Sequence, residues 1–199
     1  MEYFASAIKK GFAGPVLLEK AVIKYGNTQV LLAVVCHEET PDIKSFILET
    51  GAWFQNHAVP KLRKKATSAG KGIRDVFEAL LEEDEAAAMR ERSEKGEISF
   101  AFCADNSALI SGPCAYLLQS LFGRVSASAV FSPEDDIVAM EKGAVILLAG
   151  SKTTVTDDRE RLECLFSARD EKSLEKSVRE VSADLRDISM ICIKTGSTA

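Results

Sequence analysis

The sequence is short of the residues from which metal centres and nucleic-acid surfaces are built. It has two histidines in 199 residues, His37 and His57, and no Cys-x-x-Cys pair, so a zinc site made of imidazole and thiolate is poorly supported. Acidic residues (30) outnumber basic ones (25), and the net charge of −5 has the wrong sign for wrapping a phosphate backbone. We therefore expect no nucleic-acid partner.

Long apolar runs and paired cysteines are missing as well. No stretch approaches the roughly 18 uninterrupted apolar residues of a membrane span, and the start, MEYFASAIKKGF, lacks the apolar core of a signal peptide. The five cysteines are odd in number and far apart, which is typical of reduced thiols. We expect a cytoplasmic protein with no membrane partner, folded as one domain over residues 1–199.

Ready-made catalytic motifs are also lacking, because the chain has no P-loop, no GxSxG and no HExxH. The one suggestive pair is Cys36-His37, which ends an apolar run and would resemble an activated nucleophile if the two side chains met. Adjacent residues of a strand point to opposite faces, however, so an inert buried thiol is the better interpretation of Cys36.

The periodicity that is present predicts alternating blocks of strands and helices. QVLLAVV at 29–35 is typical of a strand buried on both faces, and apolar spacings of three and four predict helices at 41–59 and 72–92. Further elements are expected as follows: strands within 97–119 and at 125–131, 144–149 and 188–194, and helices at 157–166 and 171–185. Strands and helices in separate blocks favour an α+β fold with antiparallel sheets.

The order of these segments resembles the metal-dependent PPM-type (type 2C) protein serine/threonine phosphatases over roughly residues 15 to 194. LLAVVCHEET takes the place of that family's AxADGxGG turn before a long helix, and SALISGPCAYLLQ takes the place of VANVGDSRAYLL. KGAVILLAGSKTTV at 142–155 and LRDISMICIK at 185–194 are similar to GDxLLLxSDGLTD and SRDNITVVVV. The resemblance implies a four-layer α-β-β-α sandwich of two mainly antiparallel sheets flanked by helices.

The same resemblance locates a degenerate site, because the family's metal-binding aspartates are missing. The matched positions, which we expect to gather in one vestigial cleft, are Cys36, His37, Gly112, Ser151, Arg186 and Asp187. Gly112 and Ser151 carry no charge and a cysteine is a soft ligand, so they cannot neutralise two magnesium or manganese ions. The resemblance thus implies no catalytic residue and no metal cofactor: a pseudophosphatase that binds a phosphoprotein, a kinase or another protein partner in signalling.

Two other interpretations stay open. An active, divergent Mg- or Mn-dependent phosphatase would hold its metals with displaced acids, first among them Glu38, Glu39 and Asp187. An unrelated α+β binding module would match the family by chance, and the fold itself distinguishes that case. If the cleft has lost its metals, Lys152 and Arg186 are the candidates for holding an anion such as phosphate.

Overall fold

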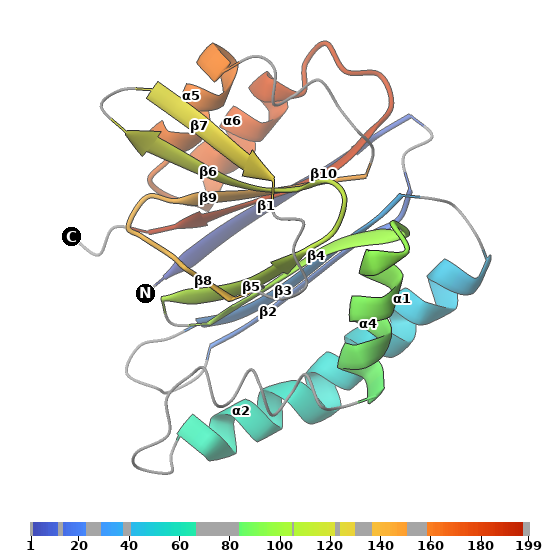
Figure 1. The fold of residues 1–199 in the computed structure, drawn as a ribbon. Coiled ribbons are helices and arrows are strands. Elements are labelled where there is room, and N and C mark those ends of the chain that lie inside the picture. The colour runs from blue at the N-terminus through green and yellow to red at the C-terminus, as the bar shows by residue number, and fades with distance from the viewer. Residues whose placement is uncertain are drawn as a thin grey trace.

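Two five-stranded sheets lie face to face, and each carries helices on its outer side (Figure 1). The computed structural model describes residues 2–11, 14–22, 29–37, 41–66, 84–104, 106–121, 124–129, 137–150 and 159–196. Sheet A has the strand order β1 (Tyr3–Lys10), β10 (Ile188–Thr195), β9 (Val145–Ala149), β6 (Ala115–Leu121), β7 (Arg124–Ala129). Sheet B has the order β2 (Val16–Val22), β3 (Gln29–Cys36), β4 (Ile98–Ala104), β5 (Ser107–Ser111), β8 (Ile137–Ala139). Every pairing between these strands is antiparallel.

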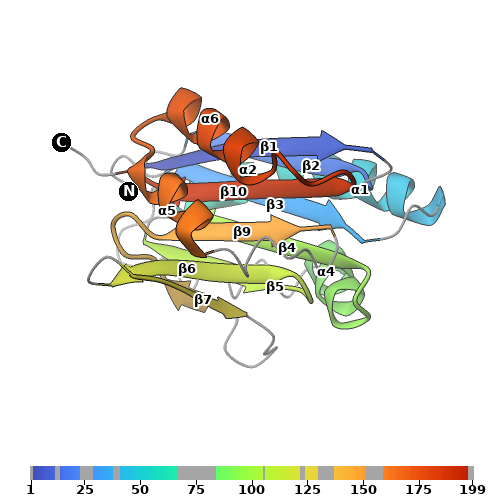
Figure 2. The same cartoon turned by 90° about the horizontal axis from the view of Figure 1, so that it is seen from above.

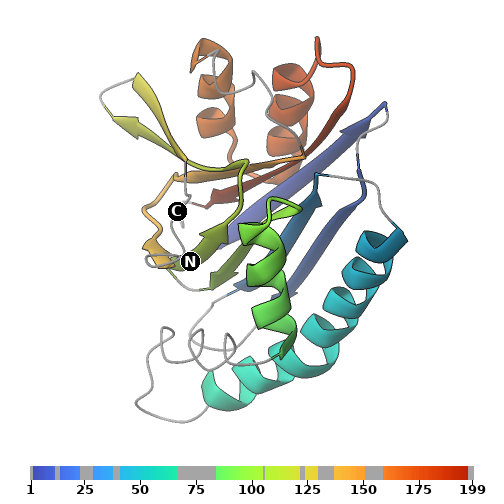
Figure 3. The same ribbon diagram turned by 45° about the vertical axis from the view of Figure 1, so that its right-hand side comes forward.

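The helices form the two outer layers. Sheet B is covered by α1 (Pro41–Trp53), the π-helical η1 (Phe54–Ala58), α2 (Val59–Ala66) and α4 (Asp84–Glu94), as Figure 3 shows. Sheet A is covered by α5 (Arg159–Ser167) and α6 (Glu171–Val181), which lie above it in Figure 1 and in front of it in Figure 2. The predicted α+β, four-layer α-β-β-α sandwich of two antiparallel sheets is confirmed.

Three apolar cores separate the four layers, and strand alternation assigns residues to them. In β3, Leu31, Ala33 and Val35 belong to the core between the sheets, while Val30, Leu32 and Val34 belong to the core beneath α1 and α4. A third core lies between sheet A and α5 with α6. Residues 29–35 therefore form the strand buried on both faces that the unbroken apolar run predicts.

The first helical segment is longer than the sequence predicts. We expected it to end near Val59-Pro60, but η1 is followed directly by α2, which continues to Ala66. Pro60, the second residue of α2, has no N–H group to donate, and it directly follows the wider π-helical turn in which the Val59 N–H bonds back to the carbonyl oxygen of Phe54. The π-helical turn shifts the buried stripe by one residue, so that Ala58 and Val59 face the sheet.

Two other helix boundaries differ from those expected. Of the helix predicted at 72–92, the described part is α4, Asp84–Glu94, which extends two residues beyond the expected end; residues 72–83 lie outside the described ranges. The last helix ends at Val181 and not at the expected residue 185. Strands β1 and β8 were not predicted. None of the helices in the described ranges is long and apolar enough to cross a membrane.

Candidate functional site

One end of the sandwich brings together chain segments that are far apart in sequence. The carbonyl oxygen of Cys36, at the end of β3, lies under two glycines, because a Cβ atom on Gly14 would be 2.9 Å from it and one on Gly150 would be 3.1 Å from it. Gly150 also donates its N–H to the carbonyl oxygen of Ser189 at 2.6 Å. The ends of β3 and β9 and the start of β10 are therefore in close contact at this point.

A hydrogen-bonded group lies on the side of this end that faces the gap between the sheets. The Nε2 atom of His37 is 2.9 Å from Oγ of Ser99, and the same hydroxyl accepts the backbone N–H of Cys114 at 3.2 Å. Ser99 is fully buried and shares its strand face with Ala101, a member of the core between the sheets. His37, and not Cys36, is thus the residue of this pair that points toward the inter-sheet gap.

Cys36 points the opposite way, into the core beneath the helices of sheet B. Its side chain is completely buried, and burial raises the pKa of its thiol to about 12, against a smaller lowering influence of Arg92. A neutral, enclosed thiol is neither a nucleophile nor a metal ligand. The Cys36–His37 pair is therefore no catalytic dyad, as the alternation of side chains along a strand predicts.

Gly112 is closed off by β4. Its backbone φ of +131° is a conformation that residues with a side chain rarely adopt. A Cβ atom there would lie 2.5 Å from Oγ and 2.7 Å from Cβ of Ser99, which is closer than non-bonded atoms approach. The position that the resemblance matches to a metal-binding aspartate thus has no space for any side chain.

Arg186 and Asp187 lie at the start of β10, and both are exposed. A Cβ atom on Gly11 would overlap the Asp187 carboxylate and lie 2.7 Å from the Arg186 carbonyl oxygen, so Asp187 covers the end of β1. Strand pairing supports this placement, because Lys10 pairs with Ile188. Asp187 is two residues from Ser189 but turns toward Gly11.

Four of the remaining candidates, Glu38, Glu39, Ser151 and Lys152, lie outside the described residues. So do Asp105, Asp157 and Asp158, three further acids that a divergent metal site could use. Within the described ranges no group of three His, Cys, Asp or Glu side chains could hold a metal ion. A pair of divalent cations needs several carboxylates, and the described residues considered above at this end of the sandwich supply an imidazole, neutral hydroxyls and an Asp187 that turns toward Gly11. The described residues do not fit a two-metal centre.

Two serines at this end were not predicted from the sequence. Ser99 and Ser189 sit in strands that read as apolar, ISFAFCA and ISMICIK, and both are almost completely buried. The Ser189 hydroxyl has no hydrogen-bond partner in the structure. Only the strand parity, which turns both serines toward the inter-sheet face, could have indicated them.

Solved structures with the same fold are PPM-type serine/threonine phosphatases. A Streptococcus agalactiae serine/threonine phosphatase superposes with a TM-score of 0.55 at 8% identity, over 98% of this chain and 99% of that one. RsbX in complex with magnesium superposes with a TM-score of 0.53 at 11% identity, over 98% and 94%. A chain from work on the bacterial stressosome gives 0.51 at 13% identity, over 97% and 98%.

At such identities the likeness establishes the fold alone. No family model matches the sequence, and no curated protein matches it at a significant level. The chain therefore has the fold of the PPM-type phosphatases, and the chemistry of its site has to be argued from its own residues.

Proposed function

We propose that this chain is a PPM-fold domain that does not hydrolyse phosphate esters and acts by binding a protein partner. The observation that carries the proposal is the closure of position 112 by Ser99. A missing carboxylate could be supplied by a neighbouring side chain, but a filled volume has no room for a carboxylate or for the ion that it would hold. His37 adds to this closure because its ring is already hydrogen-bonded to Ser99.

The proposed partner is a phosphoprotein, a kinase or another signalling protein. Structures of the same fold include RsbX in complex with magnesium and a chain from work on the bacterial stressosome, described as a modular system adapted to control secondary messenger signalling, and we take the second as support for a role in signalling. Arg186, exposed at the start of β10, and Lys152 are our candidates for contacting a phosphate group on that partner. We also propose a cytoplasmic location and no metal cofactor.

A turnover assay with a binding arm tests the proposal. The purified protein is incubated with p-nitrophenyl phosphate and with a phosphoserine peptide in excess Mn²⁺ or Mg²⁺, and we expect phosphate release no faster than in buffer. Isothermal titration calorimetry with Mn²⁺ alone should detect no binding of the metal. Metal-dependent turnover that persists through re-purification and is lost in Asp187→Asn or Glu38→Gln would instead support the active, divergent phosphatase.

The binding arm concerns Arg186. Fluorescence polarisation with phosphorylated and unphosphorylated forms of one peptide library measures whether phosphate contributes to affinity. If Arg186 contacts phosphate, Arg186→Ala should weaken binding of the phosphorylated form by roughly tenfold, because a charge-assisted hydrogen bond is lost, and should leave the other form unchanged. Lys172→Ala, an exposed lysine on α6, is the matched control.

A further inference from the structure

A hollow of about 170 Å³ lies at the end of sheet A opposite to the candidate functional site. Leu118 of β6 pairs with Val145, the first residue of β9, and the hollow is next to this pair, whereas Gly150 follows the other end of β9. The lining comes from the end of β6, the turn before β9 and the end of α5, and it includes Gln119, Ser120, Glu141, Lys142, Gly143 and Phe166. No residue of the candidate site takes part in it.

Two walls of the hollow are held in place by the last two residues of β10. The hydroxyl of Thr195, which is fully buried, donates to the Glu141 carbonyl oxygen at 2.8 Å, and its N–H donates to the Ala144 carbonyl oxygen at 3.1 Å. Lys194, which is also buried, donates from Nζ to the carbonyl oxygen of Phe166 at the end of α5. The hollow is therefore preformed, so a ligand does not have to order these walls.

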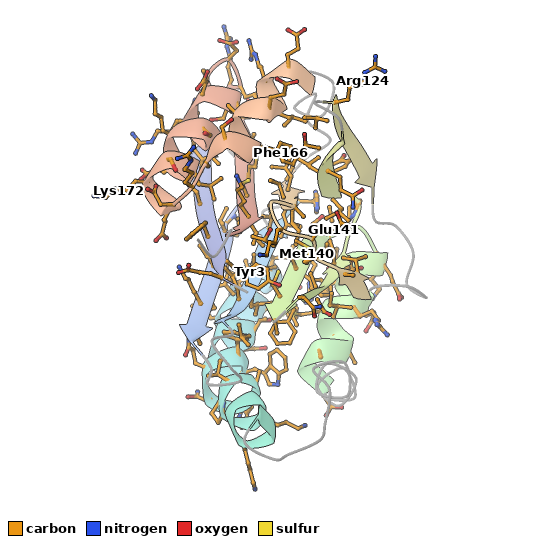
Figure 4. The ribbon with its side chains drawn as sticks, turned by 90° about the vertical axis from the view of Figure 1, so that its left-hand side faces the viewer. Tyr3, Arg124, Met140, Glu141, Phe166 and Lys172 are labelled. Atoms are coloured by element: carbon orange, nitrogen blue, oxygen red, sulfur yellow. The ribbon has the colours of Figure 1, made fainter. Side chains whose placement is uncertain are left out.

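The turn beside the hollow carries two opposite charges. Glu141 and Lys142 are adjacent and exposed, and among the described residues neither the carboxylate nor the ammonium has a hydrogen-bond or ion-pair partner. Phe166, labelled with Glu141 in Figure 4, adds an apolar ring to the lining. Glu141 would repel a phosphate group, and a purely apolar ligand would remove water from both charges without replacing it. The lining therefore fits a ligand that carries both charges and an apolar group.

The volume of the hollow limits the ligand to a small molecule. About 170 Å³ is less than the roughly 300–1,000 Å³ of pockets for drug-sized ligands, and it is close to the roughly 150 Å³ of an engineered cavity that binds benzene. A molecule of about 6–10 non-hydrogen atoms fills such a space. A nucleotide is too large for it.

We propose that the hollow binds a free α-amino acid with an apolar side chain of about the size of leucine's. The ammonium group of the ligand would face the Glu141 carboxylate, its carboxylate the Lys142 ammonium, and its side chain the ring of Phe166. The two charges of an α-amino acid are on neighbouring groups, as Glu141 and Lys142 are neighbours in the turn. This site is independent of the proposed function, because it shares no residue with the candidate site.

Isothermal titration calorimetry with L-leucine tests the proposal. We expect a dissociation constant of about 0.1–1 mM, as is usual for a ligand of so few atoms. Isocaproate lacks the ammonium group of leucine and isopentylamine lacks its carboxylate, so each should bind at least roughly tenfold more weakly than leucine. In NMR spectra of the ¹⁵N-labelled chain, the amide signals that L-leucine shifts should be those of the turn, the end of β6 and the end of α5.

Two variants connect each charge of the hollow with one group of the ligand. Lys142→Met should weaken L-leucine binding by roughly tenfold and abolish leucine's advantage over isopentylamine, whereas Glu141→Gln should weaken it equally and abolish leucine's advantage over isocaproate. Lys172→Met on α6 and Glu163→Gln on α5, at exposed positions outside the hollow, are the matched controls and should leave binding unchanged.

Four results would each overturn the proposal. They are the absence of L-leucine binding at about 10 mM, analogues that bind as tightly as leucine, amide shifts confined to another part of the fold, and control variants that weaken binding as much as Lys142→Met does.

Discussion

Replacing Gly112 by alanine distinguishes two hypotheses: that the site is sterically closed, and that it has only lost its metal ligands. If the end of the sandwich only lacked carboxylates, a side chain at 112 would find room where the family has one. If it is closed, the added Cβ atom must displace Ser99, whose Oγ and Cβ atoms would be 2.5 and 2.7 Å away. Gly112→Ala should then be strongly destabilising.

Two contributions set the loss of stability expected for Gly112→Ala. A non-glycine residue in a sparsely populated conformation costs about 1–3 kcal/mol, and overpacking a well-filled interior costs about a further 1–3 kcal/mol. The expected total of about 2–6 kcal/mol is a large share of the roughly 5–15 kcal/mol by which a domain of this kind is stable. In a chain of this length each kcal/mol corresponds to about 2–4 °C in melting temperature.

Gly143→Ala is the matched control, because Gly143 also has a positive φ, +81°, but nothing lies within 4 Å of the Cβ position. It should cost only the backbone contribution, about 1–2 kcal/mol. Urea unfolding followed by circular dichroism measures both. Ser99→Gly removes two of the overlapping atoms, so the cost of Gly112→Ala should be smaller in that background.

An aspartate at position 112, where the resemblance matches a metal-binding aspartate, meets the same obstacle. Gly112→Asp should destabilise at least as much as Gly112→Ala, and Mn²⁺ should not raise its melting temperature. If Gly112→Ala costs no more than Gly143→Ala, or if Mn²⁺ stabilises Gly112→Asp, the closed-site argument is wrong.

Three further predictions concern the thiols, a helix cap and a buried lysine. Iodoacetamide at pH 8 should modify the half-buried Cys164 first and leave Cys36 and Cys192 unmodified until urea is added, because burial raises the pKa of the Cys36 and Cys192 thiols to about 12. Mass spectrometry measures the labelling, and early modification of Cys36 would contradict its placement in the core. The backbone N–H of Ser173 donates a hydrogen bond to the Asp170 carboxylate and lowers its pKa, so this cap stabilises α6 fully above pH 3.8 and the stabilisation is lost as the pH falls through the lowered pKa. The melting temperature of Asp170→Asn should lack this acid-induced loss. A pH profile identical to that of the unmodified chain would count against the cap. Lys194→Met should destabilise by about 2–4 kcal/mol because the carbonyl oxygens of Phe166 and Ala168 lose their donor. Lys142→Met, at an exposed lysine that lines the same hollow as Glu141 and Phe166 (both labelled in Figure 4), should be neutral within about 0.5 kcal/mol in urea titrations.

Much of the layer structure can be predicted from the sequence, because a strand buried on both faces is an unbroken run of apolar residues. QVLLAVV and VILLA become β3 and β9, each with side chains in two cores. β1 was missed because YFASAIKK alternates weakly, and its partner β10 lies near the other end of the chain. β8, with three residues, is too short to show any period.

The helix that passes Pro60 illustrates a different limit. Sequence rules end a helix at a proline, but they take the helical period to be constant. Here η1 inserts a wider turn, after which Ala58 and Val59 continue the buried stripe that Trp53 and Phe54 began. Packing against sheet B sets a one-residue shift of this kind, and no local pattern in residues 54–60 predicts it.

The candidate site shows where order and spacing stop being informative. They place Cys36, Gly112 and the Arg186-Asp187 pair at strand ends, and that these positions form one cleft stays a prediction. Spacing does not say which of Cys36 and His37 faces the gap between the sheets, because alternation fixes only that they differ. The answer depends on the pairing of β3 with β4, which sets Ser99 beside His37 and leaves Cys36 under the helices. Because Ser99 then also fills the space next to Gly112, a single pairing register decides both which side chain faces the gap and whether a ligand has room there.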